Sequence, residues 1–290
     1  MLLYFSVFFN KQKGIITSKP FFLLLLFGNI EWFIKKRFLY FLVYNKDTRF
    51  EQERNQKMKI AENVEMLEVK IPRGEQTMTL YPTLIWNDNH LILIDAGLPS
   101  SGEIIAQTIK NAGFDVKDLT EILLTHQDID HIGGTRELLD FAPQAKVYAH
   151  EIDAPFIDGK KTPTKLDALE QRKNTLSPTE LPFYNMLKTG FATAQLPVDT
   201  LLRDGDVLDL CGGIETVFTP GHTPGHASFY LRSSKIMVVG DAANIANNNE
   251  LHGSNPAMTW DNEKAEASLS KIKSYDLDGV ISYHTGYLKF

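Results

Sequence analysis

Four possible metal ligands lie within six positions of one short segment. They are His126, Asp128, Asp130 and His131, and a Gly-Gly turn follows at once. No continuous helix or strand would direct all four side chains to one point, so a loop must fold around something they share. Imidazole and carboxylate groups are the ligands expected for zinc, iron or manganese. The segment therefore predicts a metal centre.

Three further candidate ligands follow later strands of the chain. His222 lies in the sequence Thr-Pro-Gly-His, Asp241 in a Gly-Asp pair and His284 in a Tyr-His pair. One small cation with an open position cannot readily share all of these groups, so the set favours two ions. Two cations a few ångströms apart would hold a water between them, lower its pKa and deliver a bridging hydroxide near neutral pH.

A simpler interpretation is a polar loop whose Asp and His only cap a helix that begins near His131. It would suffice for a single histidine. It does not explain seven candidate ligands at strand ends in a chain that has only eight His. The metal centre is therefore the stronger hypothesis.

The hydrophobic pattern predicts the elements that position these residues. Continuous or alternating apolar runs predict strands over 64–71, 78–86, 91–94, 121–124, 146–150, 214–218, 227–232, 235–239 and 279–283. The candidate ligand segments begin where strands of this set end. Strands with interspersed helices in both halves indicate packed sheets with helices outside.

Two helices and an insertion complete this prediction. Ser100-Ser-Gly-Glu103 is a capping-box pattern, which opens a helix that ends at Gly113. Residues 262–274 have the spacing of an amphipathic helix. Residues 151–205 are polar and contain several prolines, so we expect a partly helical insertion or lid there.

The chain has 290 residues and a net charge of -6, but this charge is unevenly distributed. Residues 1–57 carry 10 basic and 4 acidic residues, a net of +6, and 10 of the 18 Phe. Residues 58–290 carry the other 20 basic and 32 acidic residues, a net of -12, and all eight His. Two compositions therefore meet near Met58.

Residues 1–57 allow three interpretations: a crude membrane anchor, a loosely attached extension, or a stretch outside the natural protein. Their longest apolar run is shorter than the roughly 20 residues of a membrane helix. The order of a secretory signal, with basic residues before the apolar stretch, is not present. We favour Met58 as the true start and 58–290 as the folded domain.

Composition also limits location and partners. The single Cys211 excludes an intramolecular disulfide framework, and together with the missing signal it leads us to expect a cytoplasmic protein. The negative net charge argues against a general nucleic-acid partner, and 58–290 suggests no membrane contact. The sequence leaves the oligomeric state open.

The order of these motifs resembles the metallo-β-lactamase superfamily, whose pattern is Thr-His-x-His-x-Asp-His, Pro-x-His, Gly-Asp and a late His. The resemblance covers essentially all of 58–290. It implies a four-layered αββα sandwich that holds two divalent ions, with zinc expected first and iron or manganese as alternatives. It also implies a hydrolase that cleaves an ester, thioester, lactone or amide bond of a small molecule.

The resemblance gives each candidate residue a place. It assigns His126, Asp128 and His222 to a first metal, Asp130, His131 and His284 to a second, and Asp241 to both as a bridge. In hydrolysis, metal-bound water or a nearby carboxylate such as Asp130 would protonate the leaving group. The remaining assignments are Asp95, which would orient the metal loop, His226, which would support it, and His90, His150 and His252, which would be turn or surface residues.

The chain departs from the family pattern at Asp128, where most members have a second His. Three carboxylates then face two divalent ions, so the formal charge before hydroxide falls from +2 to +1 and Lewis acidity falls with it. A carboxylate here is similar to the flavodiiron branch, so a di-iron oxidoreductase is the alternative function. Asp128 could also be a poor ligand that leaves the first metal site weak.

The substrate pocket is less well defined. Apolar side chains of the insertion and of the loop after the bridging aspartate could line it, namely Phe156, Phe183, Tyr184, Phe191, Met258 and Trp260. Members that hydrolyse hydroxyacylglutathione keep the second His, so that substrate is not expected. A catalytically silent binding module is disfavoured by the near-complete ligand set.

Overall fold

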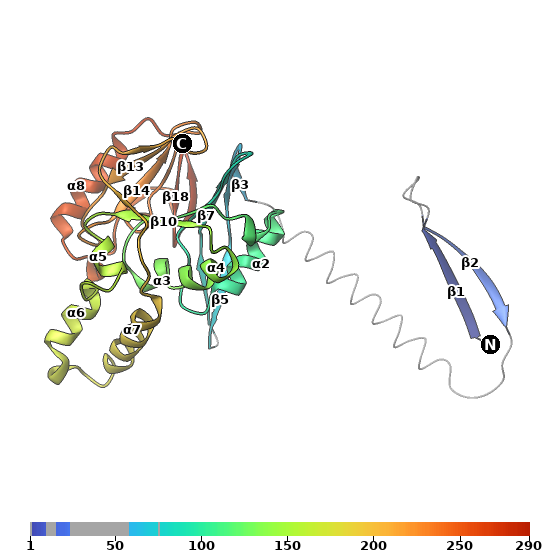
Figure 1. The fold of residues 1–290 in the computed structure, drawn as a ribbon, viewed down its shortest axis with the longest axis horizontal. Coiled ribbons are helices and arrows are strands. Elements are labelled where there is room, and N and C mark those ends of the chain that lie inside the picture. The colour runs from blue at the N-terminus through green and yellow to red at the C-terminus, as the bar shows by residue number, and fades with distance from the viewer. Residues whose placement is uncertain (1, 10–15, 24–57, 75) are drawn as a thin grey trace. The chain divides into compact units, whose positions relative to one another are not determined.

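The computed structural model of the protein describes residues 2–9, 16–23, 58–74 and 76–290 (Figure 1). The chain divides into two compact units, Met1–Gln56 and Lys57–Phe290. In the first unit, strands β1 (Leu2–Phe9) and β2 (Ile16–Leu23) pair in antiparallel orientation. The remainder of 1–57 lies outside the described residues, so the separate status of this segment stays a prediction.

A seven-stranded sheet carries the first ligand segment. Its spatial order is β11-β10-β9-β8-β7-β4-β3, and β8 to β11 run parallel while the other neighbours are antiparallel. The strands are β3 (Lys59–Ala61), β4 (Val64–Met66), β7 (Thr83–Trp86), β8 (Leu91–Ile94), β9 (Glu121–Leu124), β10 (Lys146–His150) and β11 (Thr200–Leu202). The central strands β8 and β9 are buried on both faces, as their unbroken apolar runs predict.

A six-stranded sheet carries the later ligand segments. Its order is β12-β13-β14-β15-β18-β19, and only β15 and β18 pair in parallel. The strands are β12 (Val207–Leu208), β13 (Ile214–Phe218), β14 (Ala227–Leu231), β15 (Ile236–Val238), β18 (Gly279–Ser282) and β19 (Gly286–Lys289). Two small hairpins complete the described strands, β5 (Val69–Arg73) with β6 (Gln76–Leu80) and β16 (Ala243–Ile245) with β17 (Leu251–Gly253).

Three hydrophobic clusters show how the layers stack. Because neighbouring side chains of a strand point to opposite faces, Ile92 and Ile94 of β8 pack toward the six-stranded sheet. Leu91 and Leu93 of the same strand pack on the other face, where α2 (Gly102–Ala112) and α4 (Thr135–Phe141) lie. A third cluster joins the far face of the six-stranded sheet to α8 (Asn262–Lys273). The predicted αββα sandwich is confirmed (Figure 1).

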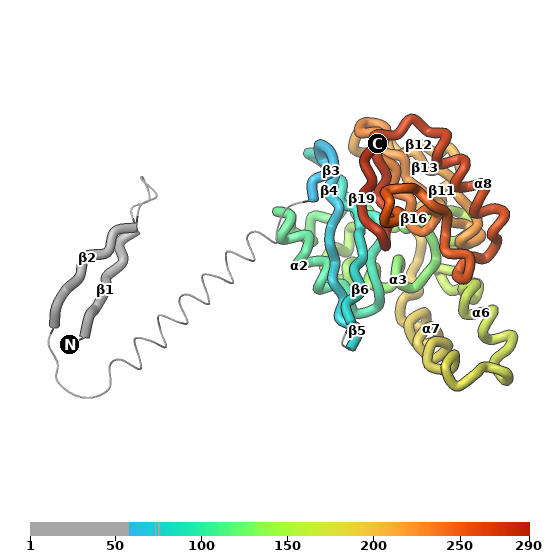
Figure 2. The backbone as a smooth tube through the Cα atoms, turned by 180° about the vertical axis from the view of Figure 1, so that it is seen from behind, coloured from blue at the N-terminus to red at the C-terminus, as the bar shows by residue number. Residues whose placement is uncertain are grey.

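The insertion after β10 is largely helical, as predicted. It contains α5 (Ala154–Ile157), α6 (Thr164–Gln171), a 3-10 turn over Lys173–Thr175, and α7 (Leu181–Ala194). Helix α7 packs against α6 and against α3 (Ile129–Ile132), the short helix of the first ligand segment. Both views show α6 and α7 extending from the sandwich on the side of α3 (Figures 1 and 2).

The structure corrects two details of the predicted elements. The predicted strands 64–71 and 78–86 each divide in two, as β4 with β5 and β6 with β7. The predicted capping box, which starts at Ser100, is wrong. The N-cap residue of α2 is Ser101, and its side chain donates to Leu98 O instead of capping the helix. Glu137 accepts hydrogen bonds from the backbone N–H groups of Ser100 and Gly102 in its place. Gly113 does end the helix, with a left-handed φ of 104°.

No helix within the described ranges is long and apolar enough to cross a membrane.

Candidate metal centre

The candidate ligands come from four loops that begin at the ends of strands. His126 follows β9, His222 follows β13, Asp241 follows β15 and His284 follows β18. Asp128 stands at the start of α3, but its side chain makes no helix-capping hydrogen bond. The interpretation of this loop as a mere helix cap is therefore not what the structure shows.

The structure brings all seven predicted ligands together. Their ligand atoms form three overlapping groups, and within each group these atoms lie within 4.8 Å of one another. The groups are His126 with Asp128 and His222, Asp130 with His131 and His284, and His126 with His131 and Asp241. The first two groups match the two metal positions that the resemblance assigns, and the third contains the bridging aspartate.

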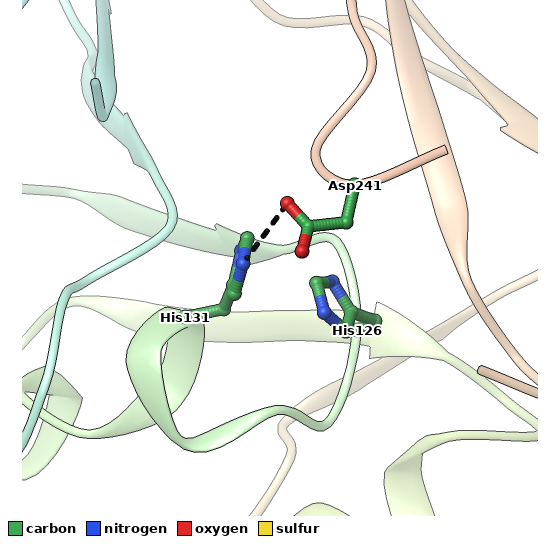
Figure 3. A group of neighbouring side chains, drawn as sticks. All are labelled: His126, His131 and Asp241. Atoms are coloured by element: carbon green, nitrogen blue, oxygen red, sulfur yellow. Dashed lines mark ion pairs between the residues drawn. The ribbon is translucent and has the colours of Figure 1, made fainter. Parts of the chain in front are cut away.

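Several inward-facing atoms of the centre lack hydrogen-bond partners among the described residues. They include His126 Nε2, His131 Nε2 and Asp241 Oδ1, all buried, and the last two face each other at 3.4 Å without a hydrogen bond (Figure 3). A buried polar atom without a hydrogen bond is costly, so the convergence of several such atoms fits a site that binds a cation. The donor set, imidazole and carboxylate, fits a divalent ion such as zinc.

Asp95 fixes the orientation of His131. Its Oδ2 lies 2.8 Å from His131 Nδ1, and its Oδ1 accepts from the backbone N–H of Thr125 at 2.9 Å. A carboxylate that binds Nδ1–H leaves the Nε2 lone pair free for a metal. Asp95 adopts a left-handed φ of 63°, which aspartate tolerates better than most residues. This arrangement matches the orienting role that the resemblance implies.

His226 supports the centre from behind. Its Nδ1 lies 2.9 Å from Thr219 Oγ1, and its Nε2 accepts from the backbone N–H of Asp241 at 3.1 Å. Both ring nitrogens are therefore used in hydrogen bonds. The fully buried ring positions the loop that carries Asp241 and has no nitrogen left for a metal.

The electrostatics of the buried groups suit metal binding. Burial and the neighbouring imidazoles lower the pKa of His126 to about 4, so its ring is neutral at physiological pH. Burial raises the pKa of Asp241, but nearby histidines outweigh it and hold that pKa well below its usual range. Burial lowers the pKa of His131 and His284, but the neighbouring carboxylates outweigh it and raise the pKa of His131 well above its usual value and that of His284 to about 9. Neutral imidazole and ionised carboxylate are the forms that bind cations, so a bound ion would displace the extra protons of these two rings.

Asp153 is a functional residue that sequence reasoning missed. Its fully buried carboxylate accepts four hydrogen bonds, from Gln127 N and Nε2, Thr223 Oγ1 and Gly225 N, at 2.7–3.0 Å. It thereby ties the loop of His126 to the loop of His222. The only available signal was its place three residues after a predicted strand.

Lys165 is the second residue that sequence reasoning missed. It lies in the first turn of α6, and its ammonium contacts Asp128 Oδ2 and lies 3.1 Å from His222 Nε2. A lysine in a polar, partly helical insertion gives no spacing signal. Its relation to Asp128 arises only when the insertion packs against the metal loop.

The histidines outside the centre differ in burial. His90 lies in the turn before β8, half-buried beside Glu121, and His252 is exposed, as predicted. The prediction for His150 as a turn or surface residue is wrong. It ends β10, is buried, and stacks on Phe218 with ring centroids 4.4 Å apart.

Comparison with known proteins gives this site its family. The model of the metallo-β-lactamase superfamily matches residues 81–284. The chain belongs to the metallo-β-lactamase superfamily. The probable metallo-hydrolase YflN of Bacillus subtilis strain 168 is 30% identical over 205 residues, 67% of this chain and 74% of that protein. A hydroxyacylglutathione hydrolase of Buchnera aphidicola is 29% identical over 154 residues, 52% of this chain and 43% of that protein.

The fold comparison agrees. A metallo-β-lactamase family protein of Thermus thermophilus has a TM-score of 0.58 at 22% identity, and the match covers 79% of this chain and 76% of that one. Membership in the superfamily implies binding of divalent metal, and the relatives named here are hydrolases, which favours hydrolysis over the flavodiiron alternative.

Two adjoining pockets open beside the centre of this superfamily member. The smaller, about 170 Å³, is lined by Asp128 and Asp130 and otherwise mainly by apolar side chains. The larger, about 350 Å³, is lined by His222, Arg172 and Trp260 among others. Lys165, Phe183 and Met258 line both pockets.

The predicted pocket residues divide into two groups. Phe183, Phe191, Met258 and Trp260 line the pockets. Tyr184 instead is buried in the hydrophobic core and donates to Glu170 Oε1 at 2.6 Å, and Phe156 lines neither pocket, its ring lying under the Lys161 ammonium. Core packing accounts for the position of Tyr184, and Phe156 instead contacts the Lys161 ammonium.

Proposed function

We propose that the protein is a metal-dependent hydrolase that cleaves an ester or thioester bond, with zinc as the working ion. The observation that carries the proposal is the convergence of three buried atoms that make no hydrogen bond, His126 Nε2, His131 Nε2 and Asp241 Oδ1, beside a mainly apolar pocket. The names of the relatives add support, since they include a hydroxyacylglutathione hydrolase, which acts on a thioester.

Different residues of the chain would bind the two parts of the substrate and transfer the proton. A divalent ion, when bound, supplies Lewis acidity and lowers the pKa of water. The smaller pocket accommodates an apolar acyl group, and the larger one, with Arg172 and Trp260, accommodates the alcohol or thiol part. Asp130 lies at the metal centre, and we assign its carboxylate the transfer of a proton to the leaving group.

The test is a hydrolase screen of metal-loaded protein on p-nitrophenyl esters and on thioesters of graded acyl length. We expect turnover that is lost in His126→Ala and Asp241→Ala and retained in the matched control His252→Ala, whose side chain is exposed. Full turnover in either of the first two variants would contradict the assignment. Stoichiometric iron with oxygen consumption and no hydrolysis would favour the di-iron alternative instead.

A further inference from the structure

The first metal position of this centre already faces a cation of the chain itself. Lys165 Nζ contacts Asp128 Oδ2 and lies 3.1 Å from His222 Nε2. These two acceptor atoms are only 2.9 Å apart, a separation that calls for a shared proton or cation. His126 Nε2 lies 3.2 Å from the same Asp128 oxygen. The ammonium group is therefore at the point where the ligands of the first metal converge.

The structure fixes the backbone at Lys165. Thr164 N–H, one residue before it, donates to Gln127 Oε1 at 2.8 Å, which ties α6 to the metal loop. Leu166 and Leu169 anchor the same helix in the core. The Lys165 side chain is only 22% exposed. A cation in the first turn of a helix is disfavoured by the helix dipole, so its position requires another partner, and Asp128 supplies it.

The charges at the centre also balance around one ion. Asp128, Asp130 and Asp241 contribute three negative charges. One divalent ion and one ammonium contribute three positive charges, so the sum is zero. Two divalent ions together with the same ammonium would give +2 before any hydroxide binds, and three cationic groups within a few ångströms repel one another strongly.

The other half of the centre is free of such a cation. Asp241 Oδ1 lies 3.4 Å from His131 Nε2 and 3.3 Å from His284 Nε2, and Asp130 Oδ2 lies 3.4 Å from His284 Nε2. Ligands arranged tetrahedrally around zinc at about 2.1 Å are about 3.4 Å apart, so these separations suit one ion. No lysine or arginine within the described ranges forms an ion pair with these two carboxylates.

We propose that the Lys165 ammonium takes the place of the first metal, so that the centre holds a single divalent ion beside Asp130, His131, Asp241 and His284. The inference rests on the proposed metal centre and replaces its two-ion form. Asp128, the departure from the family pattern, is then the partner of Lys165 rather than a ligand. His126 and His222 orient this ion pair, and His222 also lines the larger pocket.

The test counts ions and does not depend on activity. Metal-free protein is titrated with Zn²⁺, bound ions are counted by mass spectrometry after desalting, and affinities are measured by competition with a chromophoric chelator. We expect one ion per wild-type chain, with a second weaker by on the order of 100-fold or more, because like charges a few ångströms apart repel strongly. Lys165→Met should bind two ions, and Lys165→Arg, which keeps the charge, one.

A matched control is Lys188→Met in α7, an exposed lysine of the same insertion that pairs with Glu170 and should leave the count at one. Two ions of comparable affinity in the wild-type chain would overturn the inference, even if Lys165→Met failed to fold. A count of one in folded Lys165→Met and Lys165→Gln would also overturn it. The expected counts without any esterase or thioesterase activity would support this inference and contradict the proposed function.

Discussion

Replacement of Asp153 tests whether a buried carboxylate joins the two halves of the metal centre. Its Oδ1 accepts from Gln127 Nε2 and Gly225 N, and its Oδ2 accepts from Gln127 N and Thr223 Oγ1. In Asp153→Asn one oxygen becomes an NH₂ group, which cannot accept. In Asp153→Ala both acceptors are lost. The two variants therefore remove different numbers of acceptors from the same four donors.

The hydrogen bonds set the expected magnitudes. If the new NH₂ group faces Thr223, the hydroxyl can rotate and accept, so only the backbone N–H of Gln127 loses its acceptor. One orphaned buried N–H costs about 1–3 kcal/mol, and we add nothing for the lost charge because its burial was itself unfavourable. In Asp153→Ala the N–H of Gly225 and the Nε2 amide of Gln127 are orphaned as well, so the expected cost triples to about 3–9 kcal/mol.

The assay is urea unfolding followed by circular dichroism with a chelator present, so that metal binding does not add to stability. Asp167→Asn is the control, because that carboxylate is exposed and accepts a hydrogen bond from the nearby Gln171 side chain. Metal affinity, measured separately, should fall about 10–100-fold in Asp153→Asn as both ligand loops loosen. A free energy of unfolding for Asp153→Ala within about 0.5 kcal/mol of wild type would refute the reasoning.

Three further predictions follow from individual contacts. Asp95→Asn should weaken metal binding about 10–100-fold in a chelator competition, because the group that orients His131 is changed; unchanged affinity would contradict this. Burial raises the pKa of Cys211 to about 11 from 9.0. Because the thiolate is the reactive form, alkylation of Cys211 by iodoacetamide at pH 8 should be about 100-fold slower than in the urea-unfolded chain, and equal rates would contradict this prediction. Gly240→Ala places a Cβ 2.8 Å from His226 Nε2 at a φ of +50°, so the thermal midpoint should fall, with about 1–3 kcal/mol lost; an unchanged midpoint would argue against the crowding.

The centre of the fold could be predicted from sequence because its signals are local. Strands 91–94, 121–124 and 146–150 have the predicted bounds, since a buried strand with sheet neighbours on both sides needs a nearly continuous apolar run. Strand β11 was missed and β19 was not foreseen, because edge strands are short and half exposed. The cap of α2 was misassigned because Glu137, distant in sequence, supplies it.

The ligand set could also be predicted, for a related reason. Each ligand segment begins shortly after a strand, and strand ends of a sandwich converge at one edge. The residues that connect the ligands carry no such marker. Asp153 lies 26 positions from Gln127, and Lys165 lies 37 positions from Asp128. Such contacts depend on how the insertion packs, which no local pattern encodes.

Gln127 explains why the departure at Asp128 and the lysine should be interpreted as one feature. Its amide donates to Asp153 and accepts from the backbone of Thr164, so the metal loop and α6 share one hydrogen-bonded side chain. Lys165 follows Thr164 directly, and Asp128 follows Gln127 directly. The hydrogen bond between Gln127 and Thr164 thus holds the backbones that carry Asp128 and Lys165 close together. A histidine at 128 would remove the carboxylate that contacts that partly buried ammonium, so in the proposed one-ion form the aspartate and the lysine depend on each other.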